Sequence, residues 1–449
     1  MAQQTARDAA LAILLKIEQR EAYSHLLIHR AVAENRLDPK DKALLTRLVY
    51  GTVQHQNTLD FYLDAVIKKQ PEKWVRVLLR LAVYQMAYLD KVPDRAVLHE
   101  TVEIAKRRGH RGTAGFVNGV LRALQREGFP DPKVLKDPSE RLAVQTSHPA
   151  WLLNRWLEQY GLRTVQHICE ANNTAPKVTA RINRTRTSKD HLLQRLEEEG
   201  VKAKSGNLAP EAIEITEGTV QDTENFRDGL FTIQDESSML AAHALDVAEG
   251  MKVLDGCAAP GGKTTHIAEL MSNTGTVVGL DLHKHKIKLI EQQAQRLGLT
   301  NVKAEALDSR LAGQRFGETR FDRILVDAPC SGFGVIRRKP DIKWRKTPND
   351  VRVLSRVQGD ILQALAPLLK PGGKLVYSTC TVGTEENDAV ITSFLRNHHD
   401  FVSDPTLKDR MPPVVGKCVD AGKNGIQILP HDFGTDGFYI AALQKEEAG

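Results

Sequence analysis

Cysteine is scarce in this chain of 449 residues. The five cysteines stand far apart, and no two of them form a Cys-x-x-Cys pair: they are Cys169, Cys257, Cys330, Cys380 and Cys418. This spacing excludes a disulfide-rich scaffold and a zinc ribbon, so we expect no metal site. In a reducing compartment, a thiol at a special position of the fold is more often catalytic than cross-linked.

Long apolar runs are missing as well. No stretch of about 18 apolar residues occurs, so we expect no membrane span. The first residues lack a basic stretch followed by an apolar one, so we expect no secretory signal and a cytoplasmic location. Internal repeats and low-complexity tracts are also absent. The composition, 41% hydrophobic and 26% charged, is that of a globular protein whose length accommodates two to four domains.

The chain has no excess of acidic residues, and its excess of basic residues lies in the first third of the sequence. The formal net charge is +6, and residues 1–150 hold 24 basic against 17 acidic residues, whereas the remainder holds 38 against 39. A basic region of this kind suits a polyanionic partner such as nucleic acid, although a solvated basic surface explains it equally well. A basic cluster ends one predicted helix, where it can contact phosphate or simply complement the helix dipole: Lys106, Arg107, Arg108 and Arg111.

Hydrophobic periodicity divides the chain into three domains. Residues 1–145 show helical spacing with short connections, which predicts an all-α bundle. Residues 146–230 mix short helices and strands, which indicates a small α+β linker module. Residues 231–449 alternate apolar strands with helices, which predicts an α/β domain with a doubly wound parallel sheet. The apolar strand segments are 252–254, 276–280, 323–326 and 374–377.

A loop of small residues follows the first of these strands, where ligands bind in such sheets. It reads Asp255-Gly256-Cys257-Ala258-Ala259-Pro260-Gly261-Gly262-Lys263-Thr264. The loop is one residue too long for a phosphate-binding P-loop, which disfavours nucleotide hydrolysis, and the dinucleotide pattern Gly-x-Gly-x-x-Gly is absent. The remaining alternative is a turn that serves only to pack the helix against the strand. Pro-Gly-Gly at the start of a helix lowers its stability, which argues against a purely structural role.

Single carboxylates follow the strand at 276–280 and a further expected strand that ends near Ala306. Asp281 stands 19 residues beyond Gly262, where a carboxylate accepts hydrogen bonds from a ribose diol, and Asp308 is placed to reach a base edge. Alone, each is more often a turn or cap residue. Together with the glycine loop they outline a site for an adenosine-containing ligand, and the lack of a phosphate clamp favours a nucleoside over a dinucleotide.

Two cysteines follow the last two predicted strands. Cys330 lies in Asp327-Ala328-Pro329-Cys330-Ser331-Gly332, and Cys380 lies in Ser378-Thr379-Cys380-Thr381. A single buried cysteine is usually structural, and we assign that role to Cys169 and Cys418. Cys330 and Cys380 both follow the carboxyl ends of strands, at the edge of the sheet where the nucleoside site is expected. This placement indicates that the two cysteines are catalytic.

These blocks resemble those of the RNA cytosine-C5 methyltransferases, a family that uses S-adenosylmethionine. The resemblance covers roughly residues 231–445 and rests on the motifs at 255–264, 327–332 and 378–381, which occur in the family's order. Further matches are Arg338-Lys339-Pro340, Glu385-Glu386-Asn387 and Asp436-Gly437-Phe438. The full layout resembles that of bacterial members that modify the small-subunit ribosomal RNA. In those members a helical NusB-like domain and a small RRM-like module precede a Rossmann-like class I methyltransferase domain.

The resemblance implies a role for each site residue. Cys380 corresponds to the nucleophile, Cys330 to the cysteine that assists product release, and Asp327 to a contact with both cofactor and target base. The cofactor would lie against Cys257, Ala258, Ala259, Pro260, Gly261, Gly262, Lys263, Asp281, Asp308 and Asp327. One departure is Lys286, where members often carry arginine, so a bidentate contact is lost there while the charge is kept.

The implied chemistry is covalent catalysis on a cytosine. Carbon 5 of cytosine is a poor nucleophile, and addition of a thiolate to carbon 6 makes it enamine-like. The base must be single-stranded or flipped out to reach such a site. Cations beside an aromatic residue suit RNA contacts, which points to the segments Arg337-Arg338-Lys339 and Lys343-Trp344-Arg345-Lys346.

The implied substrate is 16S ribosomal RNA in an unassembled or partly assembled small subunit, modified by a monomer. Two alternatives stay open at this point. The same chemistry can act on tRNA, because the catalytic blocks do not read the substrate. A non-catalytic, RNA-binding assembly factor would also carry the basic helical domain, although the presence of both cysteines argues against it.

Overall fold

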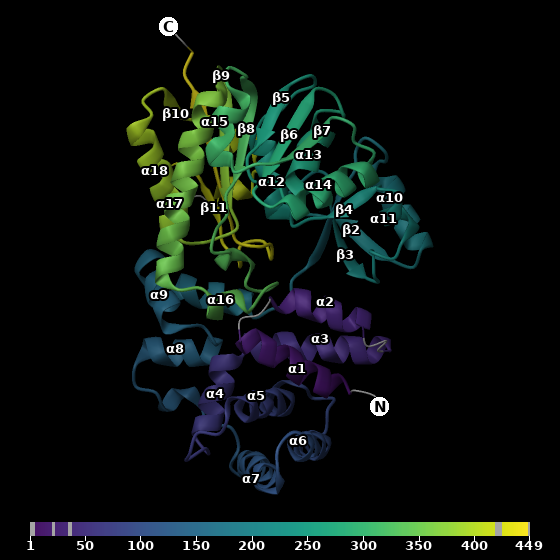
Figure 1. Ribbon diagram of the computed structural model, residues 1–449, viewed down its shortest axis with the longest axis vertical. Coiled ribbons are helices and arrows are strands. Elements are labelled where there is room, and N and C mark those ends of the chain that lie inside the picture. Colours follow the sequence, from purple (N-terminus) through teal and green to yellow (C-terminus); the bar gives the residue numbers. More distant parts are fainter. Residues whose placement is uncertain (1–4, 20–22, 35–37, 418–423, 448–449) are drawn as a thin grey trace. The chain divides into compact units, whose positions relative to one another are not determined.

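The computed structural model describes residues 5–19, 23–34, 38–417 and 424–447, so Cys418 lies outside the described residues. The chain forms two compact units (Figure 1). The first comprises Met1–Asn173 with Ile336–Arg345, and the second comprises Thr174–Val335 with Lys346–Gly449. In the described part of the chain, no helix combines the length and the apolar character that crossing a membrane requires.

The first unit is helical. Its helices are α1 (Ala6–Glu18), α2 (Ser24–Glu34), α3 (Pro39–Gln54), α4 (Gln56–Asp64), α5 (Lys73–Tyr88), α6 (Asp94–Arg108), α7 (Arg111–Glu127), α8 (Pro138–Thr146), α9 (Ala150–Asn172) and α16 (Ile342–Arg345). Helix α5 is buried along nearly all of Val75–Gln85, as expected of a central helix that is apolar on every side. Its one buried cation, Arg80, is compensated by a two-point contact with Asp60.

A short segment from the second half of the sequence, Ile336–Arg345, belongs to the first unit. The Lys343 ammonium donates to the Gln54 carbonyl at 2.9 Å, and the Trp344 indole donates to the Val53 carbonyl at 2.7 Å. These carbonyls end α3, where helices leave carbonyls without an intrahelical donor. The expectation that Lys343 contacts RNA is therefore wrong, because its side chain is fully buried, whereas an RNA contact by the half-buried Trp344 stays a prediction.

The stability of the first unit should depend on pH through Lys343. Burial lowers the pKa of this fully buried lysine from 10.5 to about 7. Between these two pH values the unfolded chain holds the proton and the folded chain does not. The free energy of unfolding should therefore rise with pH across this window, by up to about 1.4 kcal/mol per pH unit.

Urea denaturation at pH 7 and pH 9 measures this slope. Lys343→Met should reduce the gain in stability between the two pH values, whereas Lys339→Met, a change at an exposed lysine of the same segment, should keep it. An unchanged slope in Lys343→Met would show that other groups cause the pH dependence.

The second unit begins with a small α+β module. Its elements are β1 (Val178–Ile182), α10 (Lys189–Glu198), β2 (Lys202–Ser205), β3 (Ala212–Glu217), α11 (Glu224–Arg227) and β4 (Phe231–Ile233). The strand order is β2-β3-β1-β4, and the pairs are antiparallel. Apolar residues of this sheet, such as Ile182 and Phe231, pack with Leu192 and Leu196 of α10.

The rest of the second unit is built on a larger sheet with the order β10-β12-β9-β8-β5-β6-β7, and β11 pairs with β12. Strands β5 to β9 are parallel, as the sequence predicts, whereas β12 runs antiparallel to β9, β10 and β11. The elements are α12 (Glu236–Ala244), β5 (Lys252–Asp255), α13 (Gly262–Leu270), β6 (Thr276–Asp281), α14 (Lys284–Leu297), β7 (Val302–Ala306), α15 (Ala312–Phe316), β8 (Phe321–Asp327), α17 (Pro348–Leu365), β9 (Leu369–Thr379), α18 (Asp388–Asn397), β10 (Phe401–Ser403), β11 (Ile426–Ile428) and β12 (Phe438–Lys445).

Helices cover both faces of this sheet, because alternate strand residues point to opposite sides. Val253 of β5 packs in one apolar core with residues of α12, α13 and α14. Its neighbour Leu254 packs in the other core with residues of α17 and α18 (Figure 1). The doubly wound arrangement expected from the sequence is confirmed, and the carboxyl ends of the parallel strands meet at one edge.

Candidate active site

The predicted site residues lie along this carboxyl edge. Asp281 and Asp327 are the last residues of β6 and β8, and Cys380 directly follows β9. Asp308 follows β7 and caps the turn of 3-10 helix that comes next. Because β5, β6, β7, β8 and β9 are parallel neighbours, these positions gather at the ends of adjacent strands.

The small-residue loop is pressed against β6 by its backbone. The Ala258 amide donates to the Leu280 carbonyl at 2.8 Å, and a Cβ on Gly279 would come within 2.9 Å of the Ala258 Cβ. Gly261 has φ +107°, a left-handed conformation that favours glycine. Small residues therefore let the loop pack closely against the end of β6.

Asp255 fixes the two ends of this loop. Its carboxyl accepts hydrogen bonds from the Cys257 amide at 3.2 Å and from the Thr264 hydroxyl at 2.7 Å. Burial raises the pKa of Asp255 to about 7, despite these donors. Burial also raises the pKa of the Cys257 thiol well above its ordinary value, which suits a packing role rather than that of a nucleophile.

The carboxylates predicted for an adenosine ligand stand at neighbouring strand ends. Asp281 accepts from the His283 amide at 2.9 Å, and the ammonium of Lys286 lies 3.8 Å from the same oxygen. Asp308 is held by the guanidinium of Arg310, and this hydrogen bond lowers the pKa of Asp308. Sequence reasoning did not anticipate Arg310 as its partner.

Asp327 is held from both sides. One carboxyl oxygen accepts from the Lys263 ammonium at 2.8 Å, and the other accepts from the Ser378 hydroxyl at 2.8 Å. Burial opposes the charge on Lys263, but the carboxylate of Asp327 outweighs it, so the pKa of Lys263 is raised. The loop after β5 is thereby connected to the carboxyl ends of β8 and β9.

The two predicted cysteines are brought together. Their Sγ atoms lie 3.4 Å apart, because Asp327 and Ser378 are paired across β8 and β9 and each cysteine follows shortly after. The hydrogen bond to Cys380, together with burial, raises the pKa of Cys330 well above its ordinary value. Cys169, in contrast, is buried in α9 of the first unit, and burial raises its pKa to about 12.

A buried acid that sequence reasoning assigned no role supports the Cys330 segment. Glu386 is fully buried, and its carboxyl accepts from the Ser331 amide at 2.8 Å and from the Gln358 amide at 3.1 Å. Burial raises the pKa of Glu386. Gly334 contacts the second cysteine: its amide donates to the Cys380 carbonyl at 2.9 Å, and a Cβ there would lie 2.0 Å from the Gly437 carbonyl. Glu386 and Gly437 belong to two of the motifs on which the family resemblance rests. That resemblance was the only signal in the sequence that could have pointed to them.

The residues predicted to contact RNA lie in the first unit, except Lys346, which belongs to the second, and Arg337 among them is buried. Lys106, Arg107, Arg108 and Arg111 are exposed where α6 ends and α7 begins. Two of them are engaged by acids, Lys106 by Glu103 at 2.6 Å and Arg107 by Asp8 at 3.0 Å. Lys339 is exposed and Arg338 half-buried, both in the segment Ile336–Arg345.

Comparison with protein families finds three matching models along the chain. Residues 242–444 match the model described as 16S rRNA methyltransferase RsmB/F. Residues 4–126 match the NusB family, and residues 148–221 match the ferredoxin-like domain of RsmF/B-like methyltransferases. The helical, ferredoxin-like and methyltransferase parts therefore follow one another in the order that the sequence predicts.

Full-length relatives are similar to this chain. The probable ribosomal RNA small subunit methyltransferase B of Bacillus subtilis is 51% identical over 449 residues, which are 99% of this chain and 100% of that protein. Its counterpart from Synechocystis is 37% identical over 447 residues, 98% of this chain and 99% of that protein. The crystal structure of PH0851 is 27% identical, covers 99% of both chains and has a TM-score of 0.83.

Proposed function

Since the chain belongs to the RsmB/F family of 16S rRNA methyltransferases, we propose that it transfers a methyl group from S-adenosylmethionine to carbon 5 of a cytosine in 16S rRNA. The observation that carries this proposal is the pair of thiols 3.4 Å apart beside Asp327. Cytosine-C5 chemistry needs one thiol to activate the ring and a second group to release it, and this edge of the sheet offers both.

The residues present fit a nucleoside cofactor. The loop 257–263 is built of small residues and packs close to its neighbours, since a Cβ on Gly261 would lie 3.1 Å from the Ile290 Cα of α14, and Asp281 and Asp308 supply carboxylates at adjacent strand ends. S-adenosylmethionine supplies a methyl group made electrophilic by its sulfonium. The carboxylate of Asp281 would accept from the ribose hydroxyls, and Asp308 would contact the adenine edge.

Cys380 acts as the nucleophile in this proposal. Its thiolate adds to carbon 6 of cytosine, which makes carbon 5 electron-rich enough to accept the methyl group. Asp327 contacts N3 and holds or donates a proton there as negative charge develops on the ring. The two hydrogen bonds to Asp327, from Lys263 and Ser378, orient its carboxyl group for this contact.

Cys330 completes the reaction. After methylation, the proton on carbon 5 must leave before the bond between carbon 6 and the Cys380 sulfur can break. Cys330, as its thiolate, accepts the proton from carbon 5. The electron pair of that C–H bond restores the double bond between carbons 5 and 6 as the Cys380 thiolate leaves, and any proton held at N3 returns to Asp327. Because the Cys380 thiol and burial raise the pKa of Cys330, Cys330 must first lose its own proton to solvent before it can act as this base.

The target cytosine is unpaired or flipped out of its helix when it enters the site. The basic residues where α6 meets α7, together with Arg338 and Lys339, supply sequence-independent phosphate contacts. We place the substrate among protein-free or partly assembled small-subunit RNA, and the reaction in the cytoplasm. The names of the full-length relatives support ribosomal RNA over tRNA.

Side-by-side methyl transfer tests this proposal. Purified protein with S-adenosylmethionine is given protein-free 16S rRNA or bulk tRNA, and new 5-methylcytosine is located by bisulfite sequencing. We expect one or a few modified cytosines in the rRNA and none above background in the tRNA. Modification of tRNA alone would overturn the substrate, and methylation of any other atom would overturn the chemistry.

A further inference from the structure

A fully buried arginine of the small α+β module reaches the helix that follows the cofactor loop. Arg181 lies in β1, and helix α13 begins at Gly262, the sixth residue of the loop 257–263. The Arg181 guanidinium donates to the Gly262 carbonyl at 2.7 Å and to the Thr265 hydroxyl at 3.0 Å. It also forms a two-point contact with Glu269 at 3.0 and 2.9 Å and donates to the side chain of Gln234.

All five guanidinium donors of Arg181 are therefore used. Three of their acceptors, Gly262, Thr265 and Glu269, belong to α13, and they include both its first residue and its last turn. Only arginine presents five donors in a rigid plane, so no other side chain can make the same set of contacts. A charge buried this completely is tolerated only with such full compensation.

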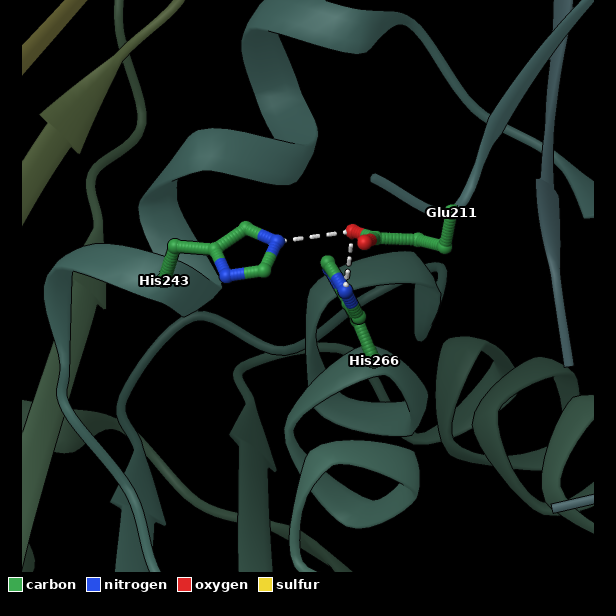
Figure 2. A group of neighbouring side chains, drawn as sticks. All are labelled: Glu211, His243 and His266. Carbon is green, nitrogen blue, oxygen red and sulfur yellow. Dashed lines mark hydrogen bonds and ion pairs between the residues drawn. The ribbon is translucent and has the colours of Figure 1, made fainter. Parts of the chain in front are cut away.

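A second contact joins the same helix to the module. Figure 2 shows the carboxyl group of Glu211, which precedes β3, between the imidazoles of His243 on α12 and His266 on α13. One oxygen lies 2.9 Å from the His243 nitrogen and 2.8 Å from the His266 nitrogen. The grouping of an acid with two histidines resembles a metal-ligand set. The positive charge of Arg181 beside His266 disfavours a cation here, and the Glu211 carboxyl forms a hydrogen bond with His243 while lying 2.8 Å from the His266 nitrogen.

Two groups on the module thus hold successive residues of α13, Thr265 and His266, while Arg181 also holds the carbonyl of Gly262. The residue after Gly262 is Lys263, whose ammonium contacts Asp327. Displacement of Gly262 would move the cofactor loop on one side and the partner of Asp327 on the other.

We propose that Arg181 is a positioning residue for the S-adenosylmethionine site, through which the small α+β module holds the cofactor loop in its binding conformation. This inference rests on the proposed function, because it takes loop 257–263 as the cofactor site. It gives the module a role in cofactor binding in addition to its position between the other domains.

The test separates positioning from folding with a paired substitution. Arg181→Met combined with Glu269→Met removes both charges, so no unpaired charge stays buried, but the Gly262 carbonyl loses its donor. The matched control is Arg296→Met. Arg296 of α14 donates to the Phe226 and Phe231 carbonyls of the module, and within the described residues its side chain forms no hydrogen bond or ion pair with α13.

Calorimetric titration with S-adenosylmethionine alone is the first readout, since it involves neither RNA nor chemistry. We expect the double variant to bind about tenfold more weakly than wild type, the equivalent of one to two hydrogen bonds, and the Arg296→Met control to change by less than about twofold. Wild-type affinity in a folded double variant would overturn the positioning role. An equal loss of affinity in the Arg296→Met control would also overturn the positioning role. It would show that losing any contact with the module weakens cofactor binding, whether or not that contact reaches α13.

Hydrogen–deuterium exchange of the ligand-free protein is the second readout. Peptides covering residues 256–270 should exchange faster in the double variant than in either wild type or the Arg296→Met control, and unchanged exchange would refute the proposal. If wild type itself fails to bind S-adenosylmethionine, the proposed function fails, while the exchange experiment still decides whether Arg181 holds this loop.

Discussion

Methyl transfer to 16S rRNA should be lost when Cys380 is changed to alanine. Without the thiolate, carbon 5 of cytosine is not activated. Removal of a nucleophile that acts together with other catalytic groups lowers the rate constant by a factor on the order of 10⁴ or more. Transfer of a radiolabelled methyl group under single-turnover conditions measures this loss. Calorimetry on the same variant should show S-adenosylmethionine binding unchanged within about twofold, because Cys380 is not part of the cofactor loop.

Cys169→Ala is the matched control for this experiment. It removes a thiol from the first unit and should leave the rate of methyl transfer unchanged. A Cys380→Ala protein that retains more than a few per cent of wild-type activity would contradict the assignment of the nucleophile. It would then direct attention to Cys330, the other thiol of the pair.

The Cys330→Ala variant should accumulate a covalent protein–RNA complex. Attack by Cys380 is intact in this variant, but release is impaired, so the adduct should persist through denaturation. Protein-free 16S rRNA, S-adenosylmethionine and the variant are mixed and run on a denaturing gel, where the complex migrates slowly. The complex should disappear in the double variant Cys330→Ala with Cys380→Ala.

Each alternative result has a distinct meaning. If Cys330→Ala forms no adduct while wild type methylates the same RNA, then the division of work between the two thiols is wrong. If Cys380→Ala forms the adduct instead, their roles are reversed.

The carboxyl edge of the sheet could be predicted because its signals are local in the sequence. Each parallel strand is a short apolar run, and the residue that follows it is fixed at the same edge by the topology. Asp281, Asp327 and Cys380 therefore lie where the strand pattern places them. The glycine loop was recognisable for the same reason, since its small residues are contiguous.

The contacts that support this edge could not be predicted, because they join distant parts of the chain. Ser331 and Glu386 are 55 residues apart, and Arg181 and Glu269 are 88 residues apart. A single sequence contains no signal that pairs such residues. The antiparallel β12 was missed for a related reason: the alternation of strands and helices, from which the parallel sheet was inferred, does not continue to the end of the chain.

Lys343 shows how local reasoning misleads. A lysine beside a tryptophan in a basic stretch has the composition of an RNA contact, and nothing nearby indicates burial. The structure uses the same groups as donors for the last carbonyls of α3, whose position 289 residues earlier is invisible to a local pattern. The RNA contacts proposed for Arg338 and Lys339 stay predictions.

Because Ile336–Arg345 completes the first unit, the polypeptide enters that unit twice, and no single proteolytic cut can separate the two units intact. A fragment beginning at residue 174 would retain Lys343 and Trp344 without the α3 carbonyls to which they donate. Such a fragment should be prone to aggregation. A minimal methyltransferase derived from this protein would need a short polar linker in place of residues 336–345, in addition to removal of the first 173.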